Sequence, residues 1–392
     1  MRRIITANNK YLEEELAKIG IDPAACRIFK QKAESFLVKI DDLSCAQANV
    51  LKQLALTCGA DLAIPKDAYF GSRRKRFGAL LFANKRNVDK LIQRLNEQSW
   101  LSHLSSELRA LSQQKNKPVW QIKEKKIVID RTLIMGVINV NQDSFYTGNR
   151  YTNEKVIIRA AKEMEQAGAD IIDIGAESSR PGAEPVDEKE EIRRLKKILP
   201  VVTRRSRVPV SIDTYKASVA KFAIENGALI INDISGMRFD PKMGTLISKN
   251  GVGIVIMHMQ RKPKTMQKKP KYNDLMAEIF YFFKQRIEQA TAHGIDRENI
   301  VIDPGLGFGK TLNDNYQLIE RLGELKTLNR PLLVGHSRKS FIGVPFNLSP
   351  DERLEGSLGL SALLIKNGAN ILRVHDVGET KKVTRLIDRI LE

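Results

Sequence analysis

Polar and charged residues stand at the ends of several short apolar runs in this sequence. Asn139, Asp213 and Asp303 each close such a run. Carboxylate and amide oxygens accept hydrogen bonds from amino and ring N–H groups, and buried carboxylates discriminate against rings that lack these donors. Similar positions are held by Glu177, Asn232, Asp233, His258, Ser337, Arg338, Lys339, Ser340, Arg373 and His375. One such residue could be a helix cap or a salt bridge, but together they indicate a polar site that suits a planar heterocycle such as an aminopyrimidine.

Two basic residues late in the sequence indicate an anion site. Arg373 and His375 are two positions apart in a predicted strand, so their side chains point to the same face and can share an anion. A departing diphosphate needs its growing negative charge neutralised in a water-poor pocket. A hard cation such as Mg²⁺ would bridge the phosphate oxygens, and Asn139 could supply an oxygen ligand to it. The pocket therefore suits a heterocycle on one side and phosphates on the other.

Eight repeated β-strand and α-helix units are predicted from Lys126 onward, and they would position these side chains. The predicted strands cover residues 133–140, 171–176, 209–213, 230–233, 253–258, 300–304, 331–336 and 371–375. Amphipathic stretches predict helices at residues 154–166, 188–199, 216–225 and 274–292. Eight units in about 260 residues favour an α/β fold of the (β/α)8 TIM-barrel type over an open doubly wound sheet. The polar residues stand where a barrel forms its active site, at the carboxyl ends of the strands.

The region before the barrel has the pattern of a small α/β domain. Apolar runs at residues 36–40, 61–65 and 78–82 predict strands, and two leucine-rich helical faces follow them. A mostly polar stretch then breaks the helical period and contains Lys117-Pro118. We assign residues 1–111 to a small basic N-terminal domain, residues 112–129 to a connection and residues 130–392 to the barrel.

The formal net charge of +19 is concentrated in the N-terminal third, where residues 1–125 contain 23 lysines and arginines against 13 acidic residues. The densest basic run covers residues 73–76 and could contact a polyanion or form a solvated loop. A short run of charge is a weak signal for nucleic acid, so we favour the loop and expect no nucleic-acid partner.

The lengths of the apolar runs and the spacing of the cysteines predict the cellular compartment of the protein. The longest apolar runs are far shorter than the roughly 20 residues that a membrane helix needs, and Asn8, Asn9 and Lys10 interrupt the first apolar stretch before a signal peptide could form. Cys26 and Cys45, like the third cysteine Cys58, lack CxxC spacing. We expect a cytoplasmic protein with reduced thiols and no membrane contact.

A glycine-rich segment, Gly305-Leu306-Gly307-Phe308-Gly309-Lys310-Thr311, looks like a phosphate-binding P-loop. A Walker A motif requires glycine where this sequence has Pro304, so the match fails. We interpret the glycines as letting the backbone approach a ligand, with Phe308 offering an aromatic surface, although a plain tight turn remains possible.

The order of these motifs resembles that of the dihydropteroate synthases. Gly136-Val137-Ile138-Asn139-Val140 with Asp143-Ser144-Phe145, and Glu177-Ser178-Ser179-Arg180-Pro181-Gly182, are similar to the two signature segments of that family. Further matches are Ser211-Ile212-Asp213-Thr214, Ile231-Asn232-Asp233, Met257-His258-Met259-Gln260, Asp303-Pro304-Gly305, Ser337-Arg338-Lys339-Ser340 and Arg373-Val374-His375-Asp376-Val377. The resemblance covers about residues 130–391, which include all eight predicted units.

The resemblance implies an activity, the condensation of 6-hydroxymethyl-7,8-dihydropterin diphosphate with p-aminobenzoate in folate biosynthesis. Diphosphate would leave first, and the aniline nitrogen would attack the resulting cation. The pterin would be held by Asp213, Asn232, Met257, Asp303 and Lys339. The diphosphate and its Mg²⁺ would be held by Asn139, Arg373 and His375, and p-aminobenzoate by Ser179, Arg180, Pro181, Phe308 and Ser340. Asp213, Lys339 and Asn139 would be the catalytic residues, and the family implies a homodimer through the late barrel helices and sensitivity to sulfonamides.

The sequence departs from the family pattern in the first two loops. Asn141-Gln142 stands where Thr-Pro is usual, which removes a fixed φ angle, and Ser179 replaces a usual threonine but keeps its hydroxyl group. Two other classes of function remain open. A pterin-binding methyltransferase would share the barrel but would not need Arg180-Pro181, and a nucleic-acid-associated protein would use residues 73–76 with an idle barrel.

Overall fold

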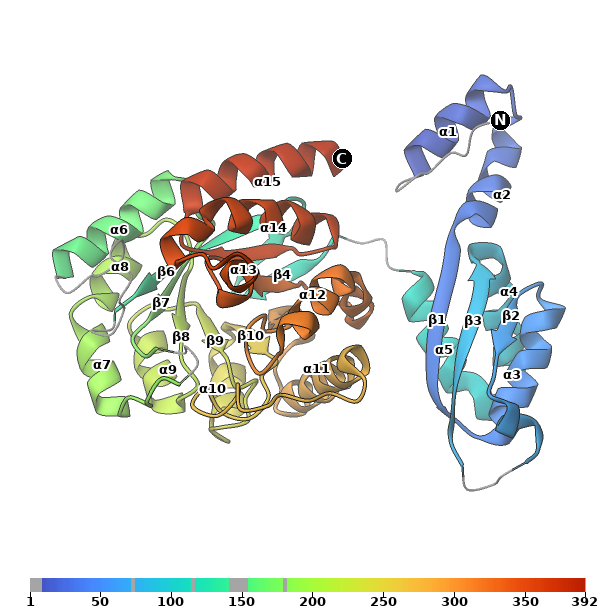
Figure 1. Cartoon of the computed structure of the whole chain (residues 1–392), viewed down its shortest axis with the longest axis horizontal. Helices are drawn as coiled ribbons and strands as arrows, with labels where there is room; N and C mark the ends of the chain where they lie inside the picture. Colours follow the sequence, from blue (N-terminus) through green and yellow to red (C-terminus); the bar gives the residue numbers. More distant parts are fainter. Residues whose placement is uncertain (1–8, 72–74, 114–116, 141–153, 179–181, 392) are drawn as a thin grey trace. The chain divides into compact units, whose positions relative to one another are not determined.

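The computed structural model describes residues 9–71, 75–113, 117–140, 154–178 and 182–391. The chain forms two compact units, Met1–Lys115 and Asn116–Glu392, and each has its own hydrophobic core. Figure 1 shows their elements in sequence colours. In the described part of the chain, no helix is long and apolar enough to cross a membrane.

The N-terminal unit is a three-stranded antiparallel sheet with helices packed on it (Figure 1). Its strands lie in the order β1 (Ser35–Leu43), β3 (Phe77–Asn84) and β2 (Asp61–Ala63). Capping boxes at Ser44 and Asn84 begin the two central helices by satisfying backbone N–H groups that the helix leaves free. The helices are α1 (Asn9–Lys18), α2 (Pro23–Ala33), α3 (Cys45–Thr57), α4 (Lys85–Asn96) and α5 (Ser102–Ser112).

The basic run at residues 73–76 is only partly described, because Arg73 and Arg74 lie outside the described residues. Lys75 Nζ lies 3.0 Å from Asp67 Oδ2, and Arg76 Nε lies 3.7 Å from Asp42 Oδ1. Both pairs are exposed, and such pairs are typical of a solvated surface loop.

Eight parallel strands form the sheet of the C-terminal unit (Figure 1), and each falls on a predicted strand. They lie in the order β11-β10-β9-β8-β7-β6-β13-β12, and a parallel bridge between Ile302 and Leu332 joins the two ends of this order. The bounds are β6 (Leu133–Asn139), β7 (Ile171–Gly175), β8 (Val210–Asp213), β9 (Ile230–Asp233), β10 (Gly253–Met257), β11 (Ile300–Asp303), β12 (Leu333–Gly335) and β13 (Ile371–Val374). The predicted (β/α)8 barrel is confirmed.

Helices surround the strands and bury their apolar faces against them (Figure 1). They are α6 (Glu154–Gln166), α7 (Glu188–Lys196), α8 (Leu199–Arg205), α9 (Ala217–Glu225), α10 (Met243–Asn250), α11 (Leu275–Ala292), α12 (Leu312–Glu320), α13 (Ser340–Gly343), α14 (Leu354–Lys366) and α15 (Val377–Leu391). The helix predicted over residues 188–199 is two helices, because Pro200 lacks the N–H that a continuing helix needs and instead stands in the first turn of α8.

The side chains that face the barrel interior are apolar at one end of the barrel, which we call the floor. They are polar at the carboxyl ends of the strands, which we call the mouth. In β13, Leu372 and Val374 belong to the core beneath the helices, while Ile371 faces the barrel interior. Arg373 follows two residues after Ile371 and points to the same face, one layer closer to the carboxyl end. The apolar layer beneath the mouth consists of Leu133, Met135, Ile171, Ile230, Val255, Val301, Leu333 and Ile371.

A short hairpin closes the floor of the barrel. β4 (Val119–Ile122) pairs with β5 (Lys125–Val128) inside the segment predicted as a connection. Trp120 is fully buried against the apolar layer, and its Nε1 donates to the carbonyl oxygen of Asn299 at 2.9 Å. A Cβ atom at Gly253 would lie 3.0 Å from that indole nitrogen, so the strand runs close to the ring because it has no side chain there.

Candidate active site

Arg373 lies in the mouth of the barrel and is paired with two buried carboxylates. Its Nε donates to Asp173 Oδ2 at 2.7 Å, and its Nη2 donates to Asp213 Oδ2 at 2.8 Å. Asn232 Nδ2 donates to the same Asp173 oxygen at 3.2 Å. Three of the predicted site residues, from β8, β9 and β13, are therefore brought together, and Asp173 of β7 joins them.

The electrostatics of this cluster follow from its burial. Burial raises the pKa of Asp213 to about 7, against the attraction of Arg373 and with a further increase from Asp173. Burial alone would lower the pKa of Arg373, but Asp173 and Asp213 raise it above its ordinary value. Arg373 therefore stays charged, and its two carboxylate neighbours neutralise it before any ligand arrives.

Asp303 and Lys339 form a second group in the mouth, next to Arg373: a Cβ at Gly335 would lie 3.8 Å from Arg373 Cβ and 3.9 Å from Lys339 Nζ. Asp303 accepts from the backbone N–H of Gly305 at 2.8 Å. Lys339 Nζ donates to the carbonyl oxygen of Leu306 and lies 4.6 Å from the centre of the Phe308 ring. Burial raises the pKa of Asp303 and lowers the pKa of Lys339 to about 8, while their mutual attraction opposes both shifts. A buried acid and a half-buried lysine thus lie together at the carboxyl ends of the strands.

The glycine-rich segment after β11 is a tight loop held from inside by Lys310. Gly305 has a φ of 68°, and a Cβ there would collide with the carbonyl oxygen of His258. Lys310 Nζ lies 2.9 Å from the Gly305 oxygen and 3.2 Å from the Phe308 oxygen, both of which accept from it. Lys310 therefore holds the loop that carries Phe308 by bonding to the backbone oxygens of that loop. The lysine of a phosphate-binding P-loop bonds instead to the phosphates of its ligand.

Methionines form an apolar wall beside these polar groups. Met257 packs with Ile234, Met259 and Met266, and Phe308 is partly buried against the same cluster. Flexible thioether side chains fit the flat faces of heterocycles and aromatic rings. The wall therefore suits the face of a planar ligand whose edge reaches the carboxylates.

The other predicted site residues occupy the rim. Asn139 ends β6, and Gly175 separates it from Asp213: a Cβ at Gly175 would lie 3.7 Å from Asn139 Oδ1 and 3.6 Å from Asp213 Cβ. His375 follows β13, and its Nδ1 lies 3.2 Å from Ser337 Oγ. Ser340 is exposed at the start of α13. Ser179, Arg180 and Pro181, and the loop with Asn141-Gln142, lie outside the described residues.

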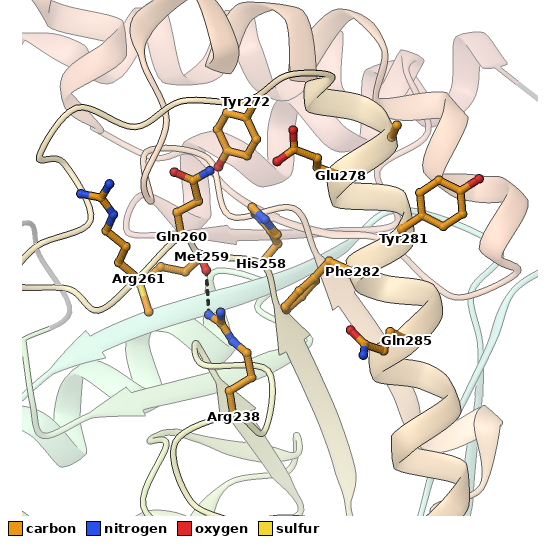
Figure 2. A pocket seen from close by; sticks show the side chains of 11 residues that line it. Arg238, His258, Met259, Gln260, Arg261, Tyr272, Glu278, Tyr281, Phe282 and Gln285 are labelled. Carbon is orange, nitrogen blue, oxygen red and sulfur yellow. Dashed lines mark hydrogen bonds between the residues drawn. The ribbon is translucent and has the colours of Figure 1, made fainter. Parts of the chain in front are cut away.

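Three polar strand-end residues do not join the cluster in the mouth. Asp233 accepts from the backbone N–H groups of Ser235 and Met237. Glu177 accepts from Tyr215 at 2.8 Å and pairs with Lys216. His258 lies on the outer side of β10, next to a cavity of about 540 Å³, with its ring centre 4.9 Å from that of Phe282 (Figure 2). The alternation along each strand explains Asp233 and His258, because each follows an inward-facing residue.

Asp173 is the residue that the sequence analysis did not select. It is fully buried in the middle of β7 and accepts from both Arg373 and Asn232. The signal was present, since Asp173 is the one charged residue in the otherwise apolar run 171–176. A buried charge inside a strand needs a partner, so its presence indicates a cation nearby.

A barrel whose mouth combines paired carboxylates, a half-buried lysine and an apolar wall defines a pterin-binding enzyme, and the family of pterin binding enzymes matches residues 135–375. Dihydropteroate synthase from Bacillus subtilis is 42% identical over 262 residues, which are 67% of this chain and 90% of that protein. The crystal structure of dihydropteroate synthase from Yersinia pestis in a sulfonamide complex superposes with a TM-score of 0.67 at 40% identity, covering 70% of this chain and 99% of the other. The chain therefore belongs to the dihydropteroate synthases, which are transferases.

One relative also matches the N-terminal unit. A bifunctional dihydropteroate synthase/dihydropteroate reductase from Helicobacter pylori is 34% identical over 376 residues, which cover 95% of this chain and 94% of that protein. The extra length relative to the Bacillus subtilis enzyme is therefore shared with at least one known protein.

Proposed function

We propose that the protein condenses 6-hydroxymethyl-7,8-dihydropterin diphosphate with p-aminobenzoate to give 7,8-dihydropteroate and diphosphate. The observation that carries this proposal is the pairing of Arg373 with Asp173 and Asp213 at the centre of the mouth. The cation can bind the diphosphate half of a pterin diphosphate, and the carboxylates can accept hydrogen bonds from its pterin half.

The pterin is proposed to bind between the two carboxylate groups of the mouth. Asp213 and Asp303 would accept from the amino and ring N–H groups, and Asn232 would offer both a donor and an acceptor. Lys339 would donate to a ring acceptor, and Met257 would pack against the ring face. Support comes from the burial of these polar groups, because buried carboxylates favour a ligand that supplies their missing donors.

The diphosphate is proposed to bind at the rim, with Arg373 and His375. The Nε and Nη2 atoms of Arg373 bind carboxylates, while its Nη1 makes no hydrogen bond to a described residue and can donate to a phosphate oxygen. Among the described residues, no group of three acidic, histidine or cysteine side chains gathers to hold a metal ion. One oxygen ligand from Asn139 fits Mg²⁺, which often keeps several waters and binds mainly to substrate phosphates. When bound, Mg²⁺ would neutralise charge on the leaving diphosphate.

Loss of diphosphate is proposed as the first chemical step. Arg373 and His375 would stabilise the negative charge that develops on the leaving group. The pterin-methyl cation left behind would lie near Asp213, whose carboxylate stabilises it in a site of low dielectric constant. The aniline nitrogen of p-aminobenzoate then attacks that cation, forms the C–N bond and loses a proton to solvent. Phe308 and Ser340, together with Ser179, Arg180 and Pro181, are proposed to shape its binding site.

The late barrel helices are proposed to form a homodimer. Leu363 on α14 and Leu386 and Ile390 on α15 are exposed, with 42%, 62% and 66% of their surface accessible. Exposed apolar residues on two helices that contact each other are typical of subunit interfaces. The reaction is proposed to take place in the cytoplasm, which agrees with three cysteines that are all free thiols.

A second activity, reduction of dihydropteroate, is proposed for the full chain. The specific observation is that the Helicobacter pylori relative, named as a synthase and reductase, matches across both units, whereas the Bacillus subtilis synthase matches 67% of the chain. A reductase needs a hydride donor such as a nicotinamide or flavin cofactor, so the N-terminal unit is where we propose that this requirement is met.

One experiment tests both activities. The purified full-length protein, mixed with the pterin diphosphate, p-aminobenzoate and Mg²⁺, is expected to release diphosphate and form dihydropteroate, and a metal chelator should slow that release. Diphosphate release that ignores p-aminobenzoate, or no release, contradicts the synthase proposal. Reduced nicotinamide and flavin are then added, and chromatography should detect a reduced product. Accumulation of dihydropteroate alone would overturn only the second activity.

The pH dependence of the reaction should report Lys339. Burial lowers the pKa of Lys339 to about 8, so this lysine loses its proton as the pH rises through that value. We expect kcat/KM for the pterin diphosphate to fall by up to about tenfold per pH unit above pH 8. The free energy of unfolding changes in the opposite direction, because a group whose folded pKa lies below its unfolded value of about 10.4 adds stability as the pH rises between the two.

Replacing Lys339 with arginine is the control, since arginine keeps its charge in this range. Activity of that variant should persist to higher pH. If wild type and Lys339→Arg lose activity at the same pH, another group is responsible for the decrease.

A further inference from the structure

We propose that a cavity between α10 and α11, outside the active site, binds a small oxyanion, specifically a phosphate group. The cavity measures about 290 Å³ and lies next to the loop that joins β9 to α10. That size admits a phosphate with a small organic part. Its lining residues are Met237, Arg238, Pro241, Gly244, Arg286, Gln289 and His293.

The lining is basic and contains no acidic residue. The guanidinium carbons of Arg238 and Arg286 lie 5.2 and 6.0 Å from the centre of the same Phe282 ring. Burial lowers the pKa of both arginines, and Arg286 lowers that of Arg238 further. The nearest acidic influence on Arg238 comes from Asp233, whose carboxylate already accepts two backbone N–H groups. The protein therefore places two cations together without a neutralising ion pair among the described residues.

The two arginines differ in the hydrogen bonds that the protein offers to their guanidinium groups. Arg238 donates from Nε to the Ser235 oxygen at 2.7 Å and from Nη2 to the Met259 oxygen at 2.7 Å, as Figure 2 shows for the second bond. These bonds give Arg238 a structural role in its loop. The Nε of Arg286 is buried and has no hydrogen-bond partner among the described residues. The Phe282 ring, whose centre lies 6.0 Å from the Arg286 guanidinium carbon, offers the N–H groups no oxygen or nitrogen acceptor.

A buried charged donor without an acceptor is costly, and most such groups in folded proteins have a partner. An oxyanion in the cavity would accept from the Nη groups of Arg286, and its negative charge would offset the repulsion between the two guanidinium groups. It would also supply the negative charge that the cavity lining lacks, since no carboxylate lines the cavity. Among the described residues, Arg286 makes no hydrogen bond of the kind that gives Arg238 its structural role.

Gln289, His293 and Gly244 complete the lining of the cavity. Gln289 and His293 are one turn apart on α11 and at its end, and both line the cavity. A Cβ at Gly244 would lie 2.8 Å from His293 Cδ2, so the absence of a side chain at Gly244 lets the imidazole ring sit against α10. The amide of Gln289 and a ring N–H of His293 can complete the coordination of a tetrahedral anion.

The cavity is connected to the active site through a short piece of chain. Asn232 faces the mouth, and the loop that begins at Asp233 reaches Arg238 within six residues. Arg238 also bonds to Met259, two residues beyond Met257 of the pterin wall. An anion bound to Arg238 and Arg286 therefore contacts the segments that carry two proposed pterin-binding residues.

Calorimetric titration with inorganic phosphate tests the site in the full-length protein. Phosphate is also expected at Arg373 in the active site, so the comparison is between Arg286→Gln and Lys249→Gln, which removes one positive charge from the exposed surface of α10. Wild type and Lys249→Gln should bind phosphate at two sites. Arg286→Gln should lose one of them, with affinity there at least about tenfold weaker, as expected for one charge-assisted hydrogen bond.

A second variant of the lining, an activity control and a second anion test the same cavity. Gln289→Ala removes an exposed side chain, so it should fold normally and weaken the same site by a smaller factor. Arg286→Gln should retain synthase activity in phosphate-free buffer, which shows that the mouth is intact. Equal phosphate binding by Arg286→Gln and Lys249→Gln overturns the proposal, as does binding of one phosphate in every protein. Malonate provides a carboxylate comparison: a site in the cavity that takes malonate and not phosphate overturns the assignment to phosphate.

Discussion

Replacing Arg373 with alanine is expected to lower the free energy of unfolding by about 3–5 kcal/mol, as well as to weaken diphosphate binding. From the sequence alone, Arg373 is an anion-binding residue whose loss should leave the fold intact. In the structure it neutralises Asp173 and Asp213, which are buried at 0% and 8% exposure. Removing the arginine leaves two buried carboxylates next to each other, and that arrangement is unstable unless one of them takes up a proton.

The pH dependence of this loss is a sharper test than its size. Without Arg373, the pKa of Asp213 should rise above the value of about 7 that it has in the intact cluster. A group whose folded pKa is raised contributes stability at low pH and loses that contribution as the pH rises through the folded pKa. Urea unfolding should therefore show the smallest difference between wild type and Arg373→Ala near pH 5, and the largest above pH 7.

A double variant separates the two roles of the arginine. Arg373→Ala combined with Asp173→Asn removes one cation and one buried anion, so it should recover a large part of the lost stability. It should not recover diphosphate binding, because the donor to the phosphate is still missing. Stability of the double variant equal to that of Arg373→Ala alone would contradict the assignment of Asp173 as the partner.

Replacing Trp120 with alanine is expected to destabilise the barrel by about 3–5 kcal/mol, the usual cost of removing a large buried aromatic side chain. Trp120 fills the floor beneath the strands and has no exposed surface. The matched control is Trp100→Ala, which makes the same chemical change at a residue that is 45% exposed in the N-terminal unit. That control should cost less than about 1 kcal/mol.

The protein contains two tryptophans, so fluorescence and circular dichroism report different parts of it. In Trp120→Ala, the remaining indole reports the N-terminal unit, while circular dichroism follows the helices of both units, most of which belong to the barrel. We expect the larger part of the dichroism change to move to lower urea concentration and the fluorescence transition to stay. Below the transition the mouth should keep its chemistry, because Trp120 lies at the opposite end of the strands. A similar loss from both tryptophan variants would contradict the role of Trp120 as a floor plug.

The barrel could be predicted from the sequence because its strands are buried on both faces. Such strands appear as short continuous apolar runs, and each of the eight runs was found to be a strand. The same property hides which side chains face inward, since both faces are apolar. The sequence pattern therefore places Asp233 and His258 with the mouth residues, although in the structure each lies one residue away from the inward position.

Contacts between residues far apart in the chain cannot be predicted from the sequence pattern. The pairing of Arg373 with Asp173 joins residues 200 positions apart, and the floor hairpin is held by a bond from Trp120 to Asn299, 179 positions away. The hairpin also lies in a polar stretch with only a few apolar residues, so its pattern resembled a connection. In both cases the stabilising partner lies elsewhere in the fold, and no local pattern identifies it.

The paired state of Arg373 also bears on how the proposed reaction ends. Once diphosphate has left the rim, the guanidinium group does not remain as a bare charge in a buried site, because Asp173 and Asp213 are already within hydrogen-bonding distance of it. In the proposed reaction, these carboxylates would compete with the product anion for Arg373. They would lower the affinity of the empty site for free diphosphate, which would protect turnover from product inhibition at the expense of tight diphosphate binding.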